Sequence, residues 1–364
     1  MKDEVITINE LGWEKYSQDI SEALNVDSNE IARITVENKS VYTLQGDQGE
    51  LEGFLRGKVL YEDEVPANRP KVGDWVRIEK LPNERRAIIK EILPRKSKIS
   101  RKGKMDSINE QILVTNIDTS FIIQGLDNDF NLRRLERYLS IVEEGGSKPI
   151  VVLNKVDLID NVDEYISKIK EILPKITLLV ISAENGTGID NLSEYIPPLE
   201  TVVFIGSSGA GKSTIINNLL NSEVQTTKSV RDDDSRGRHT TTRRELFILP
   251  NGGIVIDTPG MREVGISPTK SLNVSFDDIE LLKTKCKFNK CDHQKTEGCA
   301  IKKAIEEGVL DKNRYRNFLK LENELERELR KKTSSFAKER KYKNKTLSKH
   351  IRKIKKYGDK YSTY

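Results

Sequence analysis

One stretch constrains the fold of this chain more than any other, the nine residues Gly206-Ser207-Ser208-Gly209-Ala210-Gly211-Lys212-Ser213-Thr214. The apolar run 202–205 precedes it and has the character of a buried strand, and residues 215–220 carry apolar side chains at helical spacing. Strand, G-x-x-x-x-G-K-S and helix form a P-loop, in which backbone N–H groups surround phosphate oxygens at a helix N-terminus. The alternative is an ordinary glycine-rich turn, but a Lys-Ser pair at this offset favours a nucleotide site.

The residue types of the P-loop assign roles within it. The ammonium group of Lys212 is expected to reach the β- and γ-phosphates, and the hydroxyl of Ser213 to ligate Mg²⁺. The remaining residues of the loop are expected to bind the nucleotide through their backbone.

Two elements upstream of the P-loop indicate which base is bound. Asn154-Lys155-Val156-Asp157 follows the strand-like run 149–153, and Ser182-Ala183 follows the run 176–181. In an N-K-x-D element the carboxylate accepts hydrogen bonds from guanine N1–H and the exocyclic amine, a donor pair that adenine does not present. A small residue after the second strand lets a backbone N–H approach guanine O6. Each element alone is a weak signal, but the two together, in this order, favour guanine.

Two further elements lie downstream. Gly237-Arg238-His239-Thr240-Thr241-Thr242 supplies hydroxyl groups for Mg²⁺ and a switch I segment. Asn251-Gly252-Gly253 separates two apolar runs, which predicts a hairpin, and the second run ends in Asp257-Thr258-Pro259-Gly260. In this D-x-x-G element Asp257 is expected to hold Mg²⁺ through water, and the Gly260 N–H to sense the γ-phosphate.

The order of these elements is unusual, because the guanine elements precede the P-loop. A circular permutation explains it, since the termini of such a sheet lie close enough to be rejoined elsewhere. Helices and strands alternate through this region, with Asn131 as the expected N-cap of the first helix, and this predicts a mostly parallel α/β sheet.

The three cysteines of the chain fall within fourteen residues, in the pattern Cys286-x₄-Cys291-x-His293-x₅-Cys299. Disulfide pairing would leave one cysteine over and does not suit a cytosolic protein. Three thiolates and one imidazole complete a tetrahedral site with no open position, which predicts structural Zn²⁺. Helices are expected around it, including one at 300–307 and one from Arg314 to about Arg330.

The permuted order, the segment 237–242, the segment 257–260 and the cysteine cluster together resemble the RsgA (YjeQ) family of ribosome small-subunit-dependent GTPases, over nearly the whole chain. The resemblance implies a GTP hydrolase in late maturation of the small ribosomal subunit. It implies GTP and GDP as ligands, Mg²⁺ and one Zn²⁺ as cofactors, the small subunit and its rRNA as partners, and hydrolysis stimulated by that subunit. Spacing leaves Thr240, Thr241 and Thr242 open as Mg²⁺ ligands, and similarity to GTPases with a Thr-Thr-Arg switch favours Thr242.

The part before the GTPase elements has a different pattern. Strand-like runs at 40–44, 53–57, 74–78 and 87–92, separated by Gly, Asp, Pro and Asn, predict a small closed barrel, with an OB-fold as the leading candidate. Such barrels often bind RNA. Four basic residues would suit phosphate contacts, although each is individually better explained as an ordinary surface charge: Arg69, Lys71, Arg85 and Arg86.

Charge is concentrated at the other end. The net charge is +5, yet residues 330–364 hold 14 Lys and Arg against 2 Asp and Glu, so the rest of the chain is net acidic. A basic tail suggests a polyanionic partner, and we favour a segment that folds on RNA over a solvated, disordered end. No apolar run approaches the roughly eighteen residues of a membrane span, so we expect a cytosolic monomer without a membrane partner.

These observations divide the chain into four parts. We expect an N-terminal extension and OB-like barrel at 1–94, a circularly permuted P-loop GTPase α/β domain at 95–265, a zinc-binding helical domain at 266–329 and the basic tail. The basic segment 94–104 is interpreted as a linker.

Catalysis needs a group that orients water. The position after D-x-x-G, where many GTPases have Gln, is Met261, so unassisted hydrolysis should be slow. Our hypothesis assigns this role to His239. The alternative is that His239 only packs switch I or contacts the partner. Two other classes stay open: a nucleotide-dependent RNA-binding module with incidental hydrolysis, and a P-loop ATPase or kinase.

Overall fold

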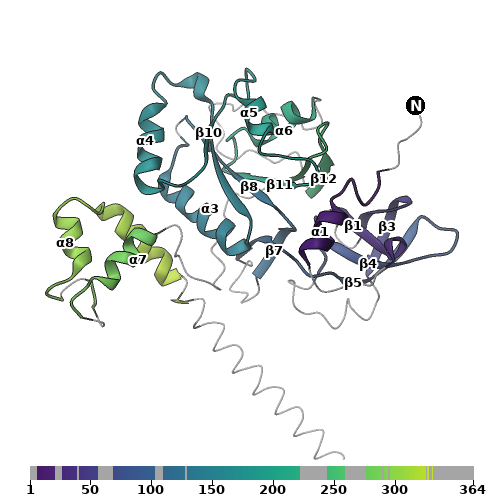
Figure 1. Ribbon diagram of the computed structural model, residues 1–364, viewed down its shortest axis with the longest axis horizontal. Coiled ribbons are helices and arrows are strands. Elements are labelled where there is room, and N and C mark those ends of the chain that lie inside the picture. Colours follow the sequence, from purple (N-terminus) through teal and green to yellow (C-terminus); the bar gives the residue numbers. More distant parts are fainter. Residues whose placement is uncertain are drawn as a thin grey trace, which may run out of the picture.

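The computed structural model has three parts, with the N-terminal barrel and the C-terminal helices on opposite sides of a central α/β domain (Figure 1). The order of parts predicted from the sequence is confirmed. The structure describes residues 6–20, 27–38, 41–55, 69–102, 110–127, 129–221, 244–258, 276–288, 291–293, 296–324, 326–327 and 330. The tail from residue 331 onward therefore lies outside the described residues.

The barrel is built from five short strands, each with buried residues. They are β1 (Ile31–Asn38), β2 (Val41–Gly46), β3 (Gly49–Leu55), β4 (Trp75–Lys80) and β5 (Arg86–Ile92). They hydrogen-bond in the order β1-β2-β3-β5-β4, and β4 returns to pair with β1. This closed five-stranded arrangement fits the predicted OB-like barrel.

Two details of the barrel correct the sequence prediction. The first strand, β1, was not among the four predicted runs, although Ile34 and Val36 alternate with polar residues along it. Lys71, considered as a phosphate contact, is buried and pairs with the carboxylate of Glu37, so it is unavailable to RNA.

The residues before the barrel cover one of its surfaces. Helix α1 (Trp13–Asp19) places the ring of Trp13 5.0 Å from that of Trp75, and Tyr16 lies 5.6 Å from the same ring. The Tyr16 hydroxyl donates to the carbonyl of Pro94 at 2.6 Å. These aromatic side chains therefore pack into and against the barrel core. A short 3₁₀ turn, η1 (Ser28–Glu30), leads into β1.

The predicted linker at 94–104 is partly a strand. β6 (Lys98–Lys102) pairs antiparallel with β7 (Glu110–Thr115) in a separate two-stranded sheet. Ile99 is fully buried and lies in the same core cluster as helix α3 (Leu132–Gly145). The strand was not predicted because Ile99 is the only large apolar residue in an otherwise basic segment.

The central sheet has the order β10-β9-β8-β11-β13-β12. Its members are β8 (Thr119–Gly125), β9 (Lys148–Asn154), β10 (Leu178–Val180), β11 (Thr201–Gly206), β12 (Arg244–Ile248) and β13 (Ile254–Asp257). All are parallel except β12, which forms the predicted hairpin with β13. The predicted α/β class is confirmed.

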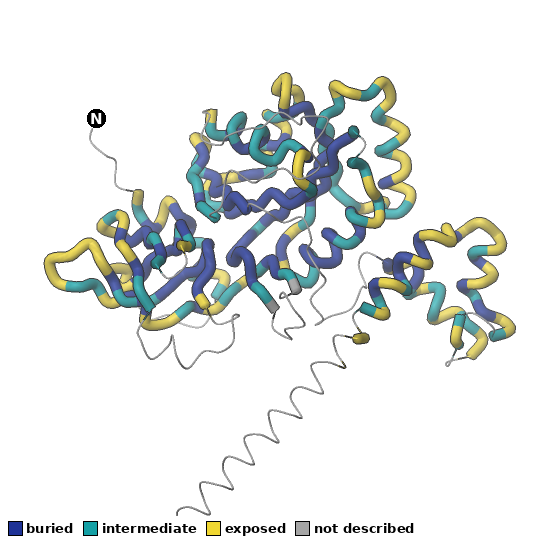
Figure 2. Tube along the Cα trace, turned by 180° about the vertical axis from the view of Figure 1, so that it is seen from behind, coloured by how far each residue is buried: buried dark blue, intermediate teal, exposed yellow. Residues whose placement is uncertain are grey.

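Helices cover both faces of this sheet. α3 and α4 (Asp163–Ile172) pack on one face, and α5 (Ile189–Ser193) and α6 (Lys212–Leu220) on the other. The Asn131 side chain caps α3 by accepting from the Arg134 N–H, as predicted. Figure 2 shows the strands buried between helices whose outer sides are exposed.

The sheet does not end at β12. Val36 of β1 pairs with Glu245 of β12, so the barrel and the central sheet share hydrogen bonds. Glu37 accepts from Arg244 at 3.1 Å across this junction. The barrel is thus attached to the strand that emerges from the predicted switch I segment.

The C-terminal part consists of α7 (Asp277–Thr284), α8 (Ala300–Glu306) and a helix that includes residues 312–324. Phe276 and Phe318 meet in its core with their rings 5.4 Å apart. Leu325 and Leu329, within the helix expected from Arg314 to about Arg330, lie outside the described residues. Within the described part of the chain, no helix combines the length and apolar content that a membrane crossing requires.

Candidate functional site

The predicted nucleotide elements meet at one edge of the central sheet. The P-loop follows β11, residues 154–157 follow β9, residues 182–183 follow β10, and Asp257 is the last residue of β13. These four strands are parallel, so their carboxyl ends lie at the same edge, which is where open α/β sheets bind ligands. The fold therefore gathers elements that are about a hundred residues apart.

The P-loop has a backbone that depends on glycine. Gly211 has a φ of +94°, and a Cβ there would lie 2.1 Å from the Asn154 Nδ2 atom. Lys212 starts helix α6, and its Nζ donates to the carbonyls of Gly206 at 3.0 Å and Ser207 at 2.5 Å. The ammonium group is thus held against the loop that is expected to bind phosphates.

Asn154 joins the three elements. Its side chain is buried, its Nδ2 donates to the Ala210 carbonyl at 2.8 Å, and its Oδ1 accepts from the Ala183 N–H at 2.9 Å. Asn218 of α6 donates to the Ala183 carbonyl at 2.6 Å. A single amide therefore fixes the P-loop and the Ser182-Ala183 segment relative to the base-reading element.

The base-reading carboxylate is accessible. Asp157 lies in the 3₁₀ turn η3 (Val156–Leu158), is exposed, and accepts a hydrogen bond from the Ser182 hydroxyl. Lys155 precedes it with a φ of +66°, a left-handed conformation that directs the chain sharply away from β9. The carboxylate is therefore accessible from this edge of the sheet.

The candidate magnesium residues divide into two groups. Asp257 is buried at the end of β13, and Ser213 lies in the first turn of α6. Thr242, the candidate catalytic residue His239 and the predicted γ-phosphate sensor Gly260 lie outside the described residues.

Two acidic residues of this edge were missed by the sequence reasoning. Asp127 follows β8 and accepts from Lys155 Nζ, and Asp129 accepts from the Ser207 hydroxyl. The available signal was positional, because both follow an apolar strand that runs parallel to β9 and β11.

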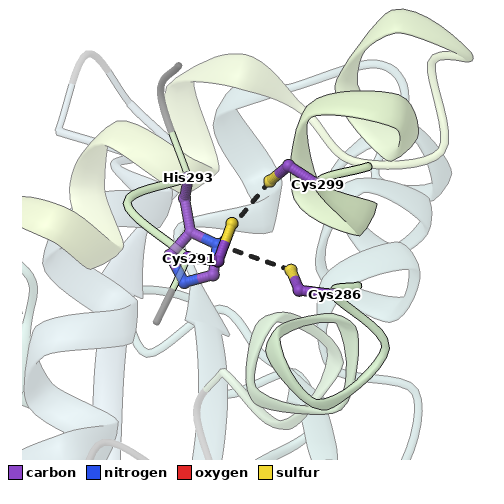
Figure 3. A group of neighbouring side chains, drawn as sticks. All are labelled: Cys286, Cys291, His293 and Cys299. Atoms are coloured by element: carbon purple, nitrogen blue, oxygen red, sulfur yellow. Dashed lines mark hydrogen bonds between the residues drawn. The ribbon is translucent and has the colours of Figure 1, made fainter. Parts of the chain in front are cut away.

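The second candidate site is the cysteine cluster, drawn in Figure 3. The ligand atoms of Cys286, Cys291, His293 and Cys299 all lie within 4.8 Å of one another. The His293 Nδ1 atom is 3.6 Å from the sulfur of Cys286 and 3.6 Å from that of Cys299. In a tetrahedral site with Zn–S bonds of about 2.3 Å, the ligand atoms lie about 4 Å from one another. Small shifts of these four side chains would therefore bring all their ligand atoms within bonding distance of one ion.

The cluster is positioned by the two short helices. Cys286 follows α7, and Cys299 is the N-cap of α8, where its sulfur accepts from the Lys302 N–H at 3.4 Å. Burial lowers the pKa of His293, and the charge of Lys283 acts in the same direction. The imidazole is therefore neutral at pH 7 and offers a lone pair, as a metal ligand must.

Two family models match the chain. The model described as RsgA GTPase matches residues 92–267, which contain every nucleotide element named above. A model described as ABC transporter matches residues 189–349, a range that contains the P-loop.

Relatives cover most of the chain. The small ribosomal subunit biogenesis GTPase RsgA 2 of Lactiplantibacillus plantarum is 42% identical over 81% of this chain and 83% of its own length. RsgA 1 of Oceanobacillus iheyensis is 42% identical over 87% of this chain and 91% of its own length.

Solved structures share the fold. YjeQ from Thermotoga maritima matches 81% of this chain and 98% of its own, with a TM-score of 0.59 and 24% identity. YloQ, described as a circularly permuted GTPase, matches 81% of this chain and 94% of its own, with a TM-score of 0.56 and 23% identity. The sequence identity to the RsgA relatives extends over most of the chain, and the solved structures share its fold. The chain therefore belongs to the RsgA family of circularly permuted GTPases.

Proposed function

We propose that this protein hydrolyses GTP as a late maturation factor of the small ribosomal subunit. One observation carries the GTPase assignment: Asn154 joins the guanine-reading element, the Ser182-Ala183 segment and the P-loop by two hydrogen bonds. Two relatives that are 42% identical to the chain are named small ribosomal subunit biogenesis GTPases, and they support the choice of partner.

The nucleotide would lie across the carboxyl edge of the sheet. Its base would meet Asn154, Lys155, Val156, Asp157, Ser182 and Ala183, and its phosphates would meet residues 206–214. Mg²⁺ bound with GTP would be held by Ser213, Thr242 and Asp257, where it would neutralise phosphate charge. The Gly260 N–H would respond to the γ-phosphate.

Hydrolysis would depend on His239, because Met261 cannot orient water. A His239→Ala variant should then lose turnover in the presence of small subunits while keeping its affinity for GDP. Unchanged subunit-stimulated turnover would assign His239 to packing or partner contact instead.

The other parts of the chain would serve attachment to the subunit. We assign rRNA binding to the barrel in 1–94 and to the basic tail at 330–364. In the domain 266–329 we assign a structural Zn²⁺ to Cys286, Cys291, His293 and Cys299. The GTPase domain would span 95–265. A ribosomal partner places the protein in the cytosol, where we expect it to act as a monomer.

Steady-state GTP hydrolysis with and without purified small subunits tests the partner, and large subunits are the control. Strong stimulation by small subunits alone supports the proposal. If neither subunit changes the rate, the chain is a guanine-nucleotide-dependent binding module, and hydrolysis is incidental to its role.

The base assignment has a separate test. Asp157→Asn replaces a carboxylate acceptor by an amide, so it should weaken GDP binding and improve xanthosine diphosphate binding, because the amide can donate to the xanthine 2-oxo group. A tenfold excess of ATP should not displace GDP from the unaltered protein. Displacement by ATP would contradict the guanine assignment.

A further inference from the structure

Two carboxylates lie at the end of β8, beside the nucleotide edge of the sheet. Asp127 and Asp129 belong to the loop between β8 and α3, and no nucleotide element predicted from the sequence includes them. A carboxylate near bound phosphates is electrostatically unfavourable unless cations or donors compensate it. Both residues have such partners, and one partner of each, Lys155 for Asp127 and Ser207 for Asp129, is a member of the predicted site.

Asp127 holds the lysine of the base-reading element. Lys155 Nζ lies 2.5 Å from Asp127 Oδ2, and both side chains are partly buried. Burial by itself raises the pKa of Asp127, but hydrogen bonds from Lys155 and from the backbone N–H of Asp129 outweigh burial and bring that pKa below its usual value. The carboxylate is therefore ionised at pH 7, which makes the contact a charge-assisted hydrogen bond.

The space for this pair is provided by Gly125. A Cβ at this glycine would lie 3.0 Å from Asp127 Oδ1 and 3.7 Å from Lys155 Cδ. Gly125 also pairs in register with Asn154, so the two strands bring Asp127 to the start of the base-reading element. The Leu126 N–H donates to the Asn154 carbonyl at 2.9 Å and extends this connection.

Asp129 holds the P-loop. Its Oδ2 accepts from the hydroxyl of Ser207, the second residue of the loop, and lies 2.8 Å from a guanidinium nitrogen of Arg134. Arg134 also donates to the Asp129 carbonyl, so the carboxylate is both neutralised and oriented. The cation comes from the first turn of α3, a rigid element of the scaffold.

The loop itself is fixed at both ends. Asp127 Oδ1 accepts from the Asp129 N–H at 3.0 Å, which closes a tight turn. The Asn131 N–H donates to Gln124 Oε1 at 3.3 Å, and Gln124 is fully buried. Both carboxylates are thus presented from a turn anchored to β8 and α3.

We propose that Asp127 and Asp129 are positioning residues, which hold Lys155 and the P-loop in the arrangement that binds a guanine nucleotide. Neither carboxylate needs to touch the ligand. A site whose side chains are already ordered loses less conformational freedom on binding, and its affinity is correspondingly higher. The inference rests on the proposed GTPase function, because it assigns the two residues to that site.

The first test is Asp127→Asn, with the affinities for fluorescent GDP and GTP analogues measured directly. Asparagine keeps the Oδ1 acceptor for the turn but loses the charge that holds Lys155. We expect both dissociation constants to rise by a similar factor of about 10, the range for a charged hydrogen bond. KM for GTP should rise with them, while kcat falls much less, because the base contact is common to ground and transition states.

A double-mutant cycle separates positioning from general stability. If Asp127 acts through Lys155, then Asp127→Asn should have little further effect on GDP affinity in a Lys155→Ala background. An equal loss in both backgrounds would show that Asp127 acts elsewhere and would overturn the proposal for this residue. Thermal unfolding without nucleotide reports whether each variant is folded.

Ser207→Ala tests the second contact without changing the loop. It removes the hydroxyl that Asp129 holds, and it should weaken GDP and GTP binding, while the double variant should bind no more weakly than Asp129→Ala alone. Additive effects would overturn the positioning role of Asp129. Asp160→Asn, at an exposed position after η3, is the matched control and should leave both affinities unchanged.

The tests also separate this inference from the proposed function. If the unaltered protein binds no guanine nucleotide, the proposed function fails. If it binds GDP and GTP, and Asp127→Asn and Ser207→Ala bind them equally well, only the positioning inference fails.

Discussion

The guanidinium of Arg314 contacts the carboxylate of Glu136 and so joins the C-terminal helices to helix α3 of the central domain. Both side chains are buried, with exposed fractions of 7% and 3%. A second guanidinium nitrogen lies 2.8 Å from Asp278 of α7, and Asn317 donates to Glu136 at 2.5 Å. One arginine therefore connects three helices, and α3 is also the helix whose first turn supplies Arg134 to the nucleotide site.

Replacing Arg314 by alanine should loosen the C-terminal part. The change leaves Glu136 buried without its cation, a situation that costs about 3–5 kcal/mol. Hydrogen exchange should accelerate in residues 312–324 and along α3, and urea should unfold the variant at lower concentration. Arg316→Ala, at an exposed position of the same helix, is the control. Equal exchange in the two variants would contradict a structural role for this ion pair.

Glu136 should make stability depend on pH. Burial raises its pKa to about 7, against the opposing effects of Arg314 and Asn317, from an ordinary value of 4.5. The folded chain then binds a proton more tightly than the unfolded chain, so this contribution to the free energy of unfolding is full below about pH 4.5 and is lost as the pH rises through 7. The loss is at most about 3 kcal/mol.

The measurement compares the unaltered protein with Glu136→Gln by urea unfolding between pH 4.5 and 8. As the pH rises, the free energy of unfolding of the unaltered protein should fall relative to that of Glu136→Gln. The variant should lack this decrease, because its side chain does not titrate. Glu164→Gln, at an exposed position of α4, controls for a general change of charge. Parallel pH profiles for Glu136→Gln and the unaltered protein would contradict the raised pKa.

Arg33 should be essential for attaching the barrel to the central domain. Its guanidinium is buried and donates to the carbonyl of Leu11 at 2.5 Å and to the Thr201 hydroxyl at 2.8 Å. Burial lowers its pKa to about 10, so the group stays charged at pH 7. Arg33→Ala leaves these buried acceptors unsatisfied and should destabilise the protein by about 3 kcal/mol or more.

Arg33→Lys should recover little of this loss, because one ammonium group cannot reach acceptors in different directions. Arg85→Ala, an exposed substitution in the same barrel, is the control for removal of a positive charge. Thermal unfolding distinguishes the three variants. A melting temperature for Arg33→Ala equal to that of Arg85→Ala would contradict the prediction.

Metal removal should unfold the C-terminal helices selectively. We expect one Zn²⁺ per chain, lost in Cys291→Ser and after treatment with a strong chelator. Helical circular dichroism should decrease, while GDP binding persists, because none of the four cluster residues lies at the carboxyl edge of the central sheet. His350→Ala, which changes a histidine outside the cluster, should keep its metal. A chelated protein with unchanged helicity and unfolding temperature would rule out a structural metal.

The sequence by itself determined the parts whose signal is local. The P-loop, the element 154–157, the hairpin before Asp257 and the Asn131 cap each depend on residues a few positions apart, where spacing and chemistry act together. The cysteine cluster is similar, since three cysteines and one histidine within fourteen residues have few other uses. The parallel sheet followed from the alternation of helices and strands, and it implied that the motifs meet at one edge.

Only the tertiary structure decided which ordinary polar residues became partners. Glu136 and Arg314 are 178 positions apart, and Lys155 and Asp127 are 28 apart. Each is of a type that is usually a solvated surface charge, so no local pattern marks it. Strand β1 and the buried Ile99 escaped prediction for a related reason, because their burial depends on β12 and on α3, which approach only when the chain is folded.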